Sequence, residues 1–173
     1  VCSSDLDINF VQFNGASSLS AGSGISVNVN TVSVSIDDND TAALSIAAAT
    51  LATEEGGTQV VTITLSTSDG AGGPAVLAPG VTLTADVVDI ATGTATSGSD
   101  YIGIGTKTVT FGASASNGAT QTVGISIIND ALVEGDETVG LKLQNLSSTL
   151  NGQARLDNTL CALAIDDNDT AQL

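Results

Sequence analysis

The sequence predicts an all-β protein whose strands form a β-sandwich. Short segments of alternating apolar and polar residues run along the chain, and clusters of Gly, Ser, Asn and Asp separate them. The nearest approach to a helical period is the Ala-rich stretch 42–52, where Ser and Thr favour a strand instead. Apolar residues make up 42% of the 173 residues, enough for a core, but only 2% are aromatic. Val, Ile, Leu and Ala must therefore fill that core.

The expected strands can be followed in order by the residues that share one face of each. The first two lie near residues 25–29 and 32–36, and the alternation changes phase at Asn30-Thr31, which indicates a β-bulge or a strand break. Each later strand has apolar residues at every second position: Leu44/Ile46, Val61/Ile63/Leu65, Val81/Leu83/Ala85/Val87, Val109/Phe111, Val123/Ile125/Ile127, Val139/Leu141/Leu143 and Cys161/Leu163/Ile165. Both prolines fall in the Gly-rich residues 70–80, which we expect to form a loop.

The charge pattern excludes several kinds of partner and chemistry. The chain has 19 acidic residues, 3 basic residues and no His, which gives a formal net charge of −16. This balance excludes a basic groove for nucleic acid and a polybasic membrane-binding patch. The absence of His excludes His-dependent triads and His-ligated metal sites, and no apolar run approaches the ~18 residues that a membrane span needs. A hard cation is the small partner that fits this composition.

A repeated segment divides the chain. Residues 36–42 (Ile-Asp-Asp-Asn-Asp-Thr-Ala) recur unchanged as residues 165–171, an offset of 129 residues between Ile36 and Ile165. We therefore expect a partial repeat in residues 1–40, one complete repeat in residues 41–169 and the start of another in residues 170–173. Residues 8–36 supply only two or three strands, which alone would expose an apolar face and unpaired backbone edges.

Most acidic side chains of the complete repeat, that of Asp86 among them, lie in expected loops or at strand ends. Because the loops of a sandwich gather at its two ends, several carboxylates are expected to converge on one tip. Two carboxylates ~4 Å apart repel by roughly 4 kcal/mol at an effective dielectric constant near 20, so such a cluster needs protons or a cation. Ca²⁺ takes about 6–8 oxygen ligands from flexible loops and suits this requirement. The alternative is a solvated acidic surface that keeps the protein soluble.

Four motifs, in this order and spacing, resemble the Calx-beta domain. They are residues 52–57 (Ala-Thr-Glu-Glu-Gly-Gly), 95–101 (Ala-Thr-Ser-Gly-Ser-Asp-Tyr), 127–138 (with Asn-Asp and Val-Glu-Gly-Asp-Glu-Thr) and 165–169 (Ile-Asp-Asp-Asn-Asp). The resemblance covers residues 41–169. It implies a seven-stranded immunoglobulin-like sandwich, often found in tandem in extracellular proteins, with calcium at one tip in the calcium-binding members.

The resemblance also implies which residues hold the ions. Carried over motif by motif, the ligands are Glu54, Asp100, Asp130, Glu134, Glu137, Asp166 and Asp167. Asn129 and Asn168 stand where strong calcium binders of the family have Asp. An amide oxygen still coordinates, but each exchange removes a negative charge and lowers the expected affinity. An EF-hand, by contrast, is excluded because Ala171 stands where its turn glycine belongs.

The remaining candidate residues do not indicate catalysis. Cys161 falls on an inward-facing strand position, so we expect a small buried core residue and not a reactive thiol. Paired carboxylates could act as a glycosidase acid and base, but the chain has almost no aromatic residues to stack a sugar, and we expect no enzyme activity. Three asparagines stand in Asn-x-Ser/Thr sequons that accept a glycan in a suitable host: Asn39, Asn145 and Asn168.

Two functions follow from the sequence. The first is a structural subunit or repeat of an extracellular fibre or adhesin, stabilised by Ca²⁺ and assembled head-to-tail into a homopolymer, with residues 8–36 adding as donor strands to a neighbouring copy. In a competing arrangement, residues 1–40 belong to a covalently attached upstream repeat. The second function is a calcium-binding adhesion module that recognises a carbohydrate or a protein.

Overall fold

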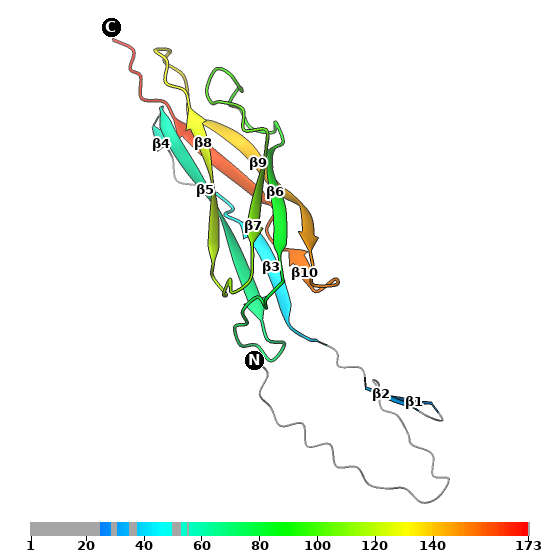
Figure 1. The fold of residues 1–173 in the computed structure, drawn as a ribbon. Coiled ribbons are helices and arrows are strands. Elements are labelled where there is room, and N and C mark those ends of the chain that lie inside the picture. The colour runs from blue at the N-terminus through cyan, green and yellow to red at the C-terminus, as the bar shows by residue number, and fades with distance from the viewer. Residues whose placement is uncertain (1–24, 29–30, 35–37, 50–52, 55, 173) are drawn as a thin grey trace, which may run out of the picture. The chain divides into compact units, whose positions relative to one another are not determined.

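A computed structural model describes residues 25–28, 31–34, 38–49, 53–54 and 56–172 of the chain. The chain divides into two units, residues 1–38 and residues 39–173 (Figure 1). Every secondary-structure element assigned in the described residues is a β-strand, which confirms the all-β fold class. The described residues contain no helix with the length and apolarity needed to cross a bilayer.

The first unit contains one hairpin of two short strands. Strand β1 (Ile25–Asn28) pairs antiparallel with β2 (Thr31–Val34), and the register joins Ile25 to Val34. Strand β1 ends at Asn28 and β2 begins at Thr31, so the two form separate strands of one hairpin. The other residues of the predicted donor segment 8–36 lie outside the described part of the chain.

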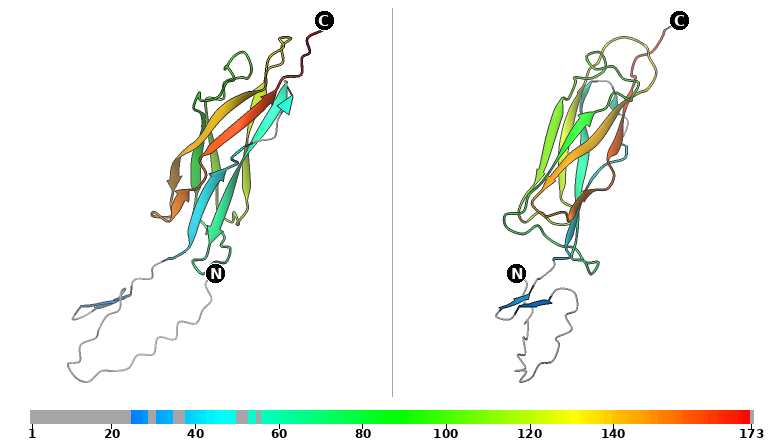
Figure 2. Two further views of the ribbon diagram at one scale, coloured as in Figure 1. Left: turned by 180° about the vertical axis from the view of Figure 1, so that it is seen from behind. Right: turned by 90° about the vertical axis from the view of Figure 1, so that its right-hand side faces the viewer.

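The second unit is a sandwich of two sheets (Figure 1; Figure 2). Strand order is β10-β3-β5-β8 in one sheet and β4-β11-β9-β6-β7 in the other. The strands are β3 (Thr41–Ile46), β4 (Thr53–Glu54), β5 (Gly57–Ser68), β6 (Leu83–Asp89), β7 (Thr106–Phe111), β8 (Thr120–Ile127), β9 (Glu137–Ser148), β10 (Ala154–Leu156) and β11 (Leu160–Asp166). The seven strands with six or more residues are the seven that the alternating pattern predicts. The short strands β4 and β10 add to them at sheet edges.

The parallel pairings join early parts of the domain to late ones. Strand β10 pairs with β3, and β4 pairs with β11, where Thr53 lies opposite Ile165 and Glu54 opposite Asp166. The backbones of the first and last sequence motifs therefore lie side by side at one edge of the five-stranded sheet.

The core lies between the sheets and consists mainly of aliphatic side chains. The inward-facing aliphatic residues of β5 and β9 are at most 1% exposed: Val61, Ile63, Leu65, Val139, Leu141 and Leu143. Cys161 is 4% exposed and belongs to the same core, as predicted. Burial raises the pKa of its thiol, which disfavours the reactive thiolate.

Asp86 departs from the expected placement of the acidic residues in loops or at strand ends. It lies in the middle of β6 between the buried residues Ala85 and Val87, so its side chain faces away from the core. Its carboxylate accepts hydrogen bonds from Thr108 Oγ1 at 2.6 Å and Asn145 Nδ2 at 3.1 Å. These bonds, the one from Thr108 first, lower the pKa of Asp86 and stabilise a charge on the outer face of the sheet.

Candidate metal centre

Three carboxylates from two loop regions converge at one end of the sandwich. Asp100 lies in the loop between β6 and β7, Glu134 lies in the loop between β8 and β9, and Glu137 is the first residue of β9. One carboxylate oxygen of each lies within 4.8 Å of the others. We call these three residues the acidic tip. The loops between β6 and β7 and between β8 and β9 lie at the end of the sandwich from which the chain continues beyond β11 (Figure 1).

The conformation of residues 96–101 places Asp100. The amide of Thr96 donates to Asp100 Oδ2 at 2.5 Å, and the amide of Asp100 donates to the carbonyl of Thr96 at 3.0 Å. The turn between them passes through Gly98 at φ +94°, a conformation that favours glycine. The amide of Ile128 donates to the Asp100 carbonyl at 2.9 Å, which joins this loop to the end of β8.

Tyr101 fixes the position of the residue next to Asp100. Its side chain is 3% exposed, and its hydroxyl donates a hydrogen bond to the carboxylate of Asp89. Burial, followed by the hydrogen bond and charge of Asp89, raises the pKa of Tyr101 to about 12. The phenol therefore stays protonated at neutral pH and continues to donate this bond.

Asp167 orders the backbone on the other side of the tip. Its Oδ2 accepts a hydrogen bond from the amide of Glu134 at 2.6 Å, and its Oδ1 accepts one from the amide of Asp169 at 2.9 Å. Asp169 in turn has a buried Oδ2 with no hydrogen-bond partner among the described residues. Because leaving a buried carboxylate oxygen unsatisfied is costly, a cation beside it would lower the free energy. The three carboxylates of the acidic tip offer only oxygen ligands, so these residues fit a hard cation.

The structure brings together three of the seven predicted ligands, namely Asp100, Glu134 and Glu137. Asp167 contacts the backbone of Glu134, while Asp130 Oδ1 accepts a hydrogen bond from the Leu132 amide at 2.7 Å, within its own loop. Asp166 ends β11 opposite Glu54, whose side chain lies outside the described part of the chain. Coordination by these other four residues stays a prediction.

Asp89 and Asp169 take part in the architecture of the tip although sequence reasoning did not assign them to it. The signal for Asp169 was present, because this residue closes the repeated Asp-Asp-Asn-Asp segment. The burial of one of its oxygens, however, depends on the path of the chain after β11. For Asp89, no pattern in the sequence indicates that Tyr101, twelve residues further on, donates a hydrogen bond to it.

Two of the three sequon asparagines make local contacts. Asn145 donates to Asp86, and a Cβ added at Gly70 would lie only 2.3 Å from Asn39 Nδ2. A glycan on either amide nitrogen would displace these contacts. Attachment at Asn39, Asn145 or Asn168 stays a prediction.

The fold and the acidic tip together define an immunoglobulin-like sandwich with an oxygen-rich cluster at one end. The profile of the Calx-beta domain matches residues 37–169. The chain belongs to the Calx-beta domain family, which confirms the resemblance stated above. No curated protein matches the chain.

Solved structures share the fold at low sequence identity. The apo-form Calx CBD1 domain is 19% identical with a TM-score of 0.54, over 75% of this chain and 99% of that chain. CBD12 from CALX1.2 is also 19% identical with a TM-score of 0.53, over 73% of this chain and 46% of that chain. The structure titled calcium binding domain CBD12 of CALX1.1 is 19% identical with a TM-score of 0.51, over 75% of this chain and 47% of that chain. The chain thus spans about half the length of the two CBD12 structures.

Proposed function

We propose that this chain is a non-catalytic calcium-binding module that works within a tandem array, with calcium held at the acidic tip. The observation that carries the proposal is the approach of three carboxylate oxygens to within 4.8 Å of one another. The family membership and the fold shared with a structure titled as a calcium binding domain support it. A cation that also reached the buried, unsatisfied Oδ2 of Asp169 would relieve the cost of leaving that oxygen without a partner.

The chemistry of the tip favours Ca²⁺ over other divalent ions. The three carboxylates offer hard oxygen ligands. Ca²⁺ accepts such ligands in variable geometry, whereas Mg²⁺ demands near-octahedral geometry. The residues of this chain would bind the ion, and Asp167 and Tyr101 would orient the loops through the hydrogen bonds described above. The ion would neutralise part of the repulsion among the carboxylates.

The chain's only tyrosine offers a direct optical test. Tb³⁺ substitutes for Ca²⁺, and a nearby tyrosine sensitises its luminescence; Tyr101 directly follows Asp100. We expect Tyr101-sensitised emission when Tb³⁺ is added to metal-free protein, and we expect excess Ca²⁺ to reverse it. Glu134→Gln and Glu137→Gln should each lower the affinity at least about tenfold, because each removes a charged ligand.

Asp157→Asn is the matched control for these variants. Asp157 is a surface carboxylate that pairs with Arg155 at 2.6 Å, beyond β10 and outside the acidic tip. Its neutralisation changes the net charge equally but should leave the Tb³⁺ titration unchanged. A wild-type protein with neither Ca²⁺-reversible emission nor calcium binding by calorimetry would refute the proposed function.

We further propose an extracellular, head-to-tail fibre as the setting of this module, with residues 8–36 adding to a neighbouring copy. The repeated segment supports an array, and among the described strands β1 and β2 form a two-stranded sheet of their own. A two-stranded hairpin is marginally stable in water and gains hydrogen bonds by joining another sheet.

Deletion of residues 1–36 tests strand donation. We expect the full chain to form oligomers in sedimentation velocity experiments and the shortened chain to remain monomeric and folded, because it lacks the donor strands. A full chain that is monomeric at every concentration tested would refute strand donation while leaving calcium binding at the acidic tip unaffected.

A further inference from the structure

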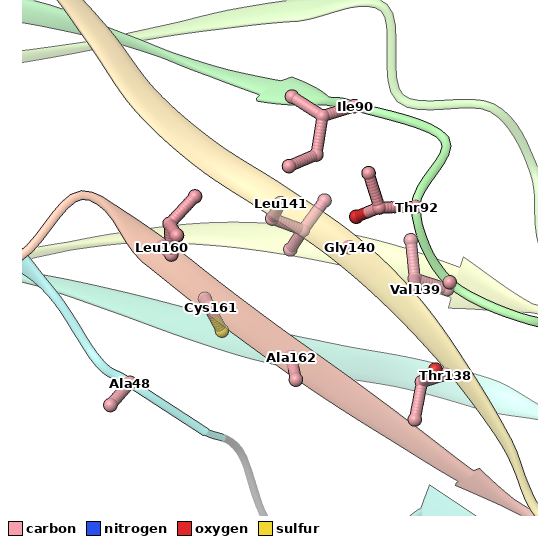
Figure 3. A pocket seen from close by; sticks show the side chains of 11 residues that line it. Ala48, Ile90, Thr92, Thr138, Val139, Gly140, Leu141, Leu160, Cys161 and Ala162 are labelled. Carbon is pink, nitrogen blue, oxygen red and sulfur yellow. The ribbon is translucent and has the colours of Figure 1, made fainter.

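The loop that carries Asp100 lies directly against the backbone of β9 at two glycines. A Cβ added at Gly93 would lie 1.8 Å from the carbonyl oxygen of Thr138, and one added at Gly140 would lie 2.2 Å from Thr92 Oγ1. At Gly93 the collision is with backbone, so this approach requires glycine there. At Gly140 the collision is with the Thr92 side chain, which would have to rotate away. The contact borders a surface pocket in which Thr92 lies beside β9 at Gly140 (Figure 3). We call it the two-glycine contact.

Hydrogen bonds hold the loop in this position. The amide of Thr138 donates to Thr94 Oγ1 at 3.0 Å, and the amide of Thr94 donates in return to Thr138 Oγ1 at 3.4 Å. The amide of Ala95 donates to the Thr138 carbonyl at 3.0 Å, and that of Ile90 donates to the Gly140 carbonyl at 3.0 Å. The loop is therefore fixed on both sides of Gly93.

Each side of the two-glycine contact leads directly to a carboxylate of the acidic tip. On β9, Glu137 immediately precedes Thr138. On the loop, Thr96 follows the fixed segment and its amide holds Asp100 Oδ2 at 2.5 Å. A shift of the loop away from β9 would therefore move Asp100 away from Glu137.

We propose that the two-glycine contact sets the separation of Asp100 and Glu137 and thereby the calcium affinity of the acidic tip. Gly93, Thr94, Thr138 and Gly140 are positioning residues, since they act through Asp100 and Glu137. The inference rests on the proposed function, because it concerns the affinity of the same site. None of these four residues belongs to the buried core, so weakening the contact should leave the sandwich folded.

Gly93→Ala tests this inference. The added Cβ collides with the Thr138 carbonyl, so the loop must move off β9. We expect calcium affinity, measured by calorimetry and by Tyr101-sensitised Tb³⁺ emission, to fall at least about tenfold in the folded protein. Gly112→Ala is the matched control: Gly112 also lacks a positive φ, and an added Cβ there meets no atom within 4 Å. Its affinity should equal that of the wild type.

Thr94→Val provides a second variant that adds no bulk. It removes the hydroxyl that accepts a hydrogen bond from the Thr138 amide, whereas Thr94→Ser keeps that hydroxyl. We expect Thr94→Val to weaken calcium binding several-fold and Thr94→Ser to bind calcium like the wild type. Both variants should show the wild-type far-ultraviolet circular dichroism spectrum. This pair decides the question if Gly93→Ala does not fold.

Three results would count against the inference. Wild-type affinity in folded Gly93→Ala and in Thr94→Val would refute it, and so would a loss of stability without a loss of affinity, since the contact would then be merely structural. A wild-type protein that binds neither Ca²⁺ nor Tb³⁺ would overturn the proposed function and this inference together. Normal wild-type binding with insensitive variants would overturn only the inference.

Discussion

Replacing Leu141 by Ala should lower the free energy of unfolding by about 2–5 kcal/mol. Leu141 is 0% exposed on β9, which pairs with both β11 and β6 in the five-stranded sheet. The loss combines the transfer free energy of the removed atoms with the cost of a cavity between the two sheets. Urea denaturation followed by circular dichroism measures it, as a lower midpoint with an unchanged slope.

Leu160→Ala is the matched control for this variant. Leu160 begins β11 but is 54% exposed, so the same truncation removes little buried surface. We expect a loss below about 1 kcal/mol. Similar losses at Leu141 and Leu160 would contradict the assignment of Leu141 to the core.

Calcium should raise the free energy of unfolding by about 2.7 kcal/mol when its free concentration is one hundred times the dissociation constant. A ligand that binds only the folded state stabilises that state by mass action. Thermal unfolding of metal-stripped protein, in millimolar calcium and then in excess EDTA, measures the effect as a rise and subsequent fall in melting temperature. An unchanged melting curve in calcium would contradict a site at the acidic tip.

Two controls separate specific binding from screening of the net charge of −16. Sodium chloride at matched ionic strength screens repulsion among exposed carboxylates without coordinating them. Mg²⁺ at the same concentration supplies the same ionic charge but should stabilise less than Ca²⁺, because it dehydrates reluctantly. Neutralising Glu134 and Glu137 together should remove the calcium-specific part of the shift and keep the part due to screening.

Sequence patterns located the seven long strands because each buries one face, and burial of one face produces a period of two residues. Strands β4 and β10 were not predicted, since two or three residues are too few to show a period. Asp86 was misplaced for a related reason: a charged residue is also accommodated on the solvent side of a strand, where Thr108 and Asn145 provide hydrogen bonds.

The convergence of carboxylates was predictable because loops meet at the ends of a sandwich, and the structure brings Asp100, Glu134 and Glu137 together. The roles of individual residues were less accessible. Asp130 and Asp167 use oxygens to bind backbone amides, which depends on exact loop conformation. Gly93 and Gly140 resemble ordinary turn or strand glycines in the sequence, and only the fold shows how closely their backbones approach other atoms.

The parallel pairings of the sandwich also have a consequence for biosynthesis. Ala42 pairs with Ala154 and Thr53 with Ile165, partners more than 100 residues apart in the chain. Strands β3 and β4 therefore leave the ribosome long before their partners β10 and β11, and contacts of such high sequence separation slow folding. In an array of similar repeats, β3 or β4 can meet the β10 or β11 of the preceding repeat before its own partner has been synthesised. Slow translation across each repeat boundary would favour pairing within one repeat over exchange between neighbours.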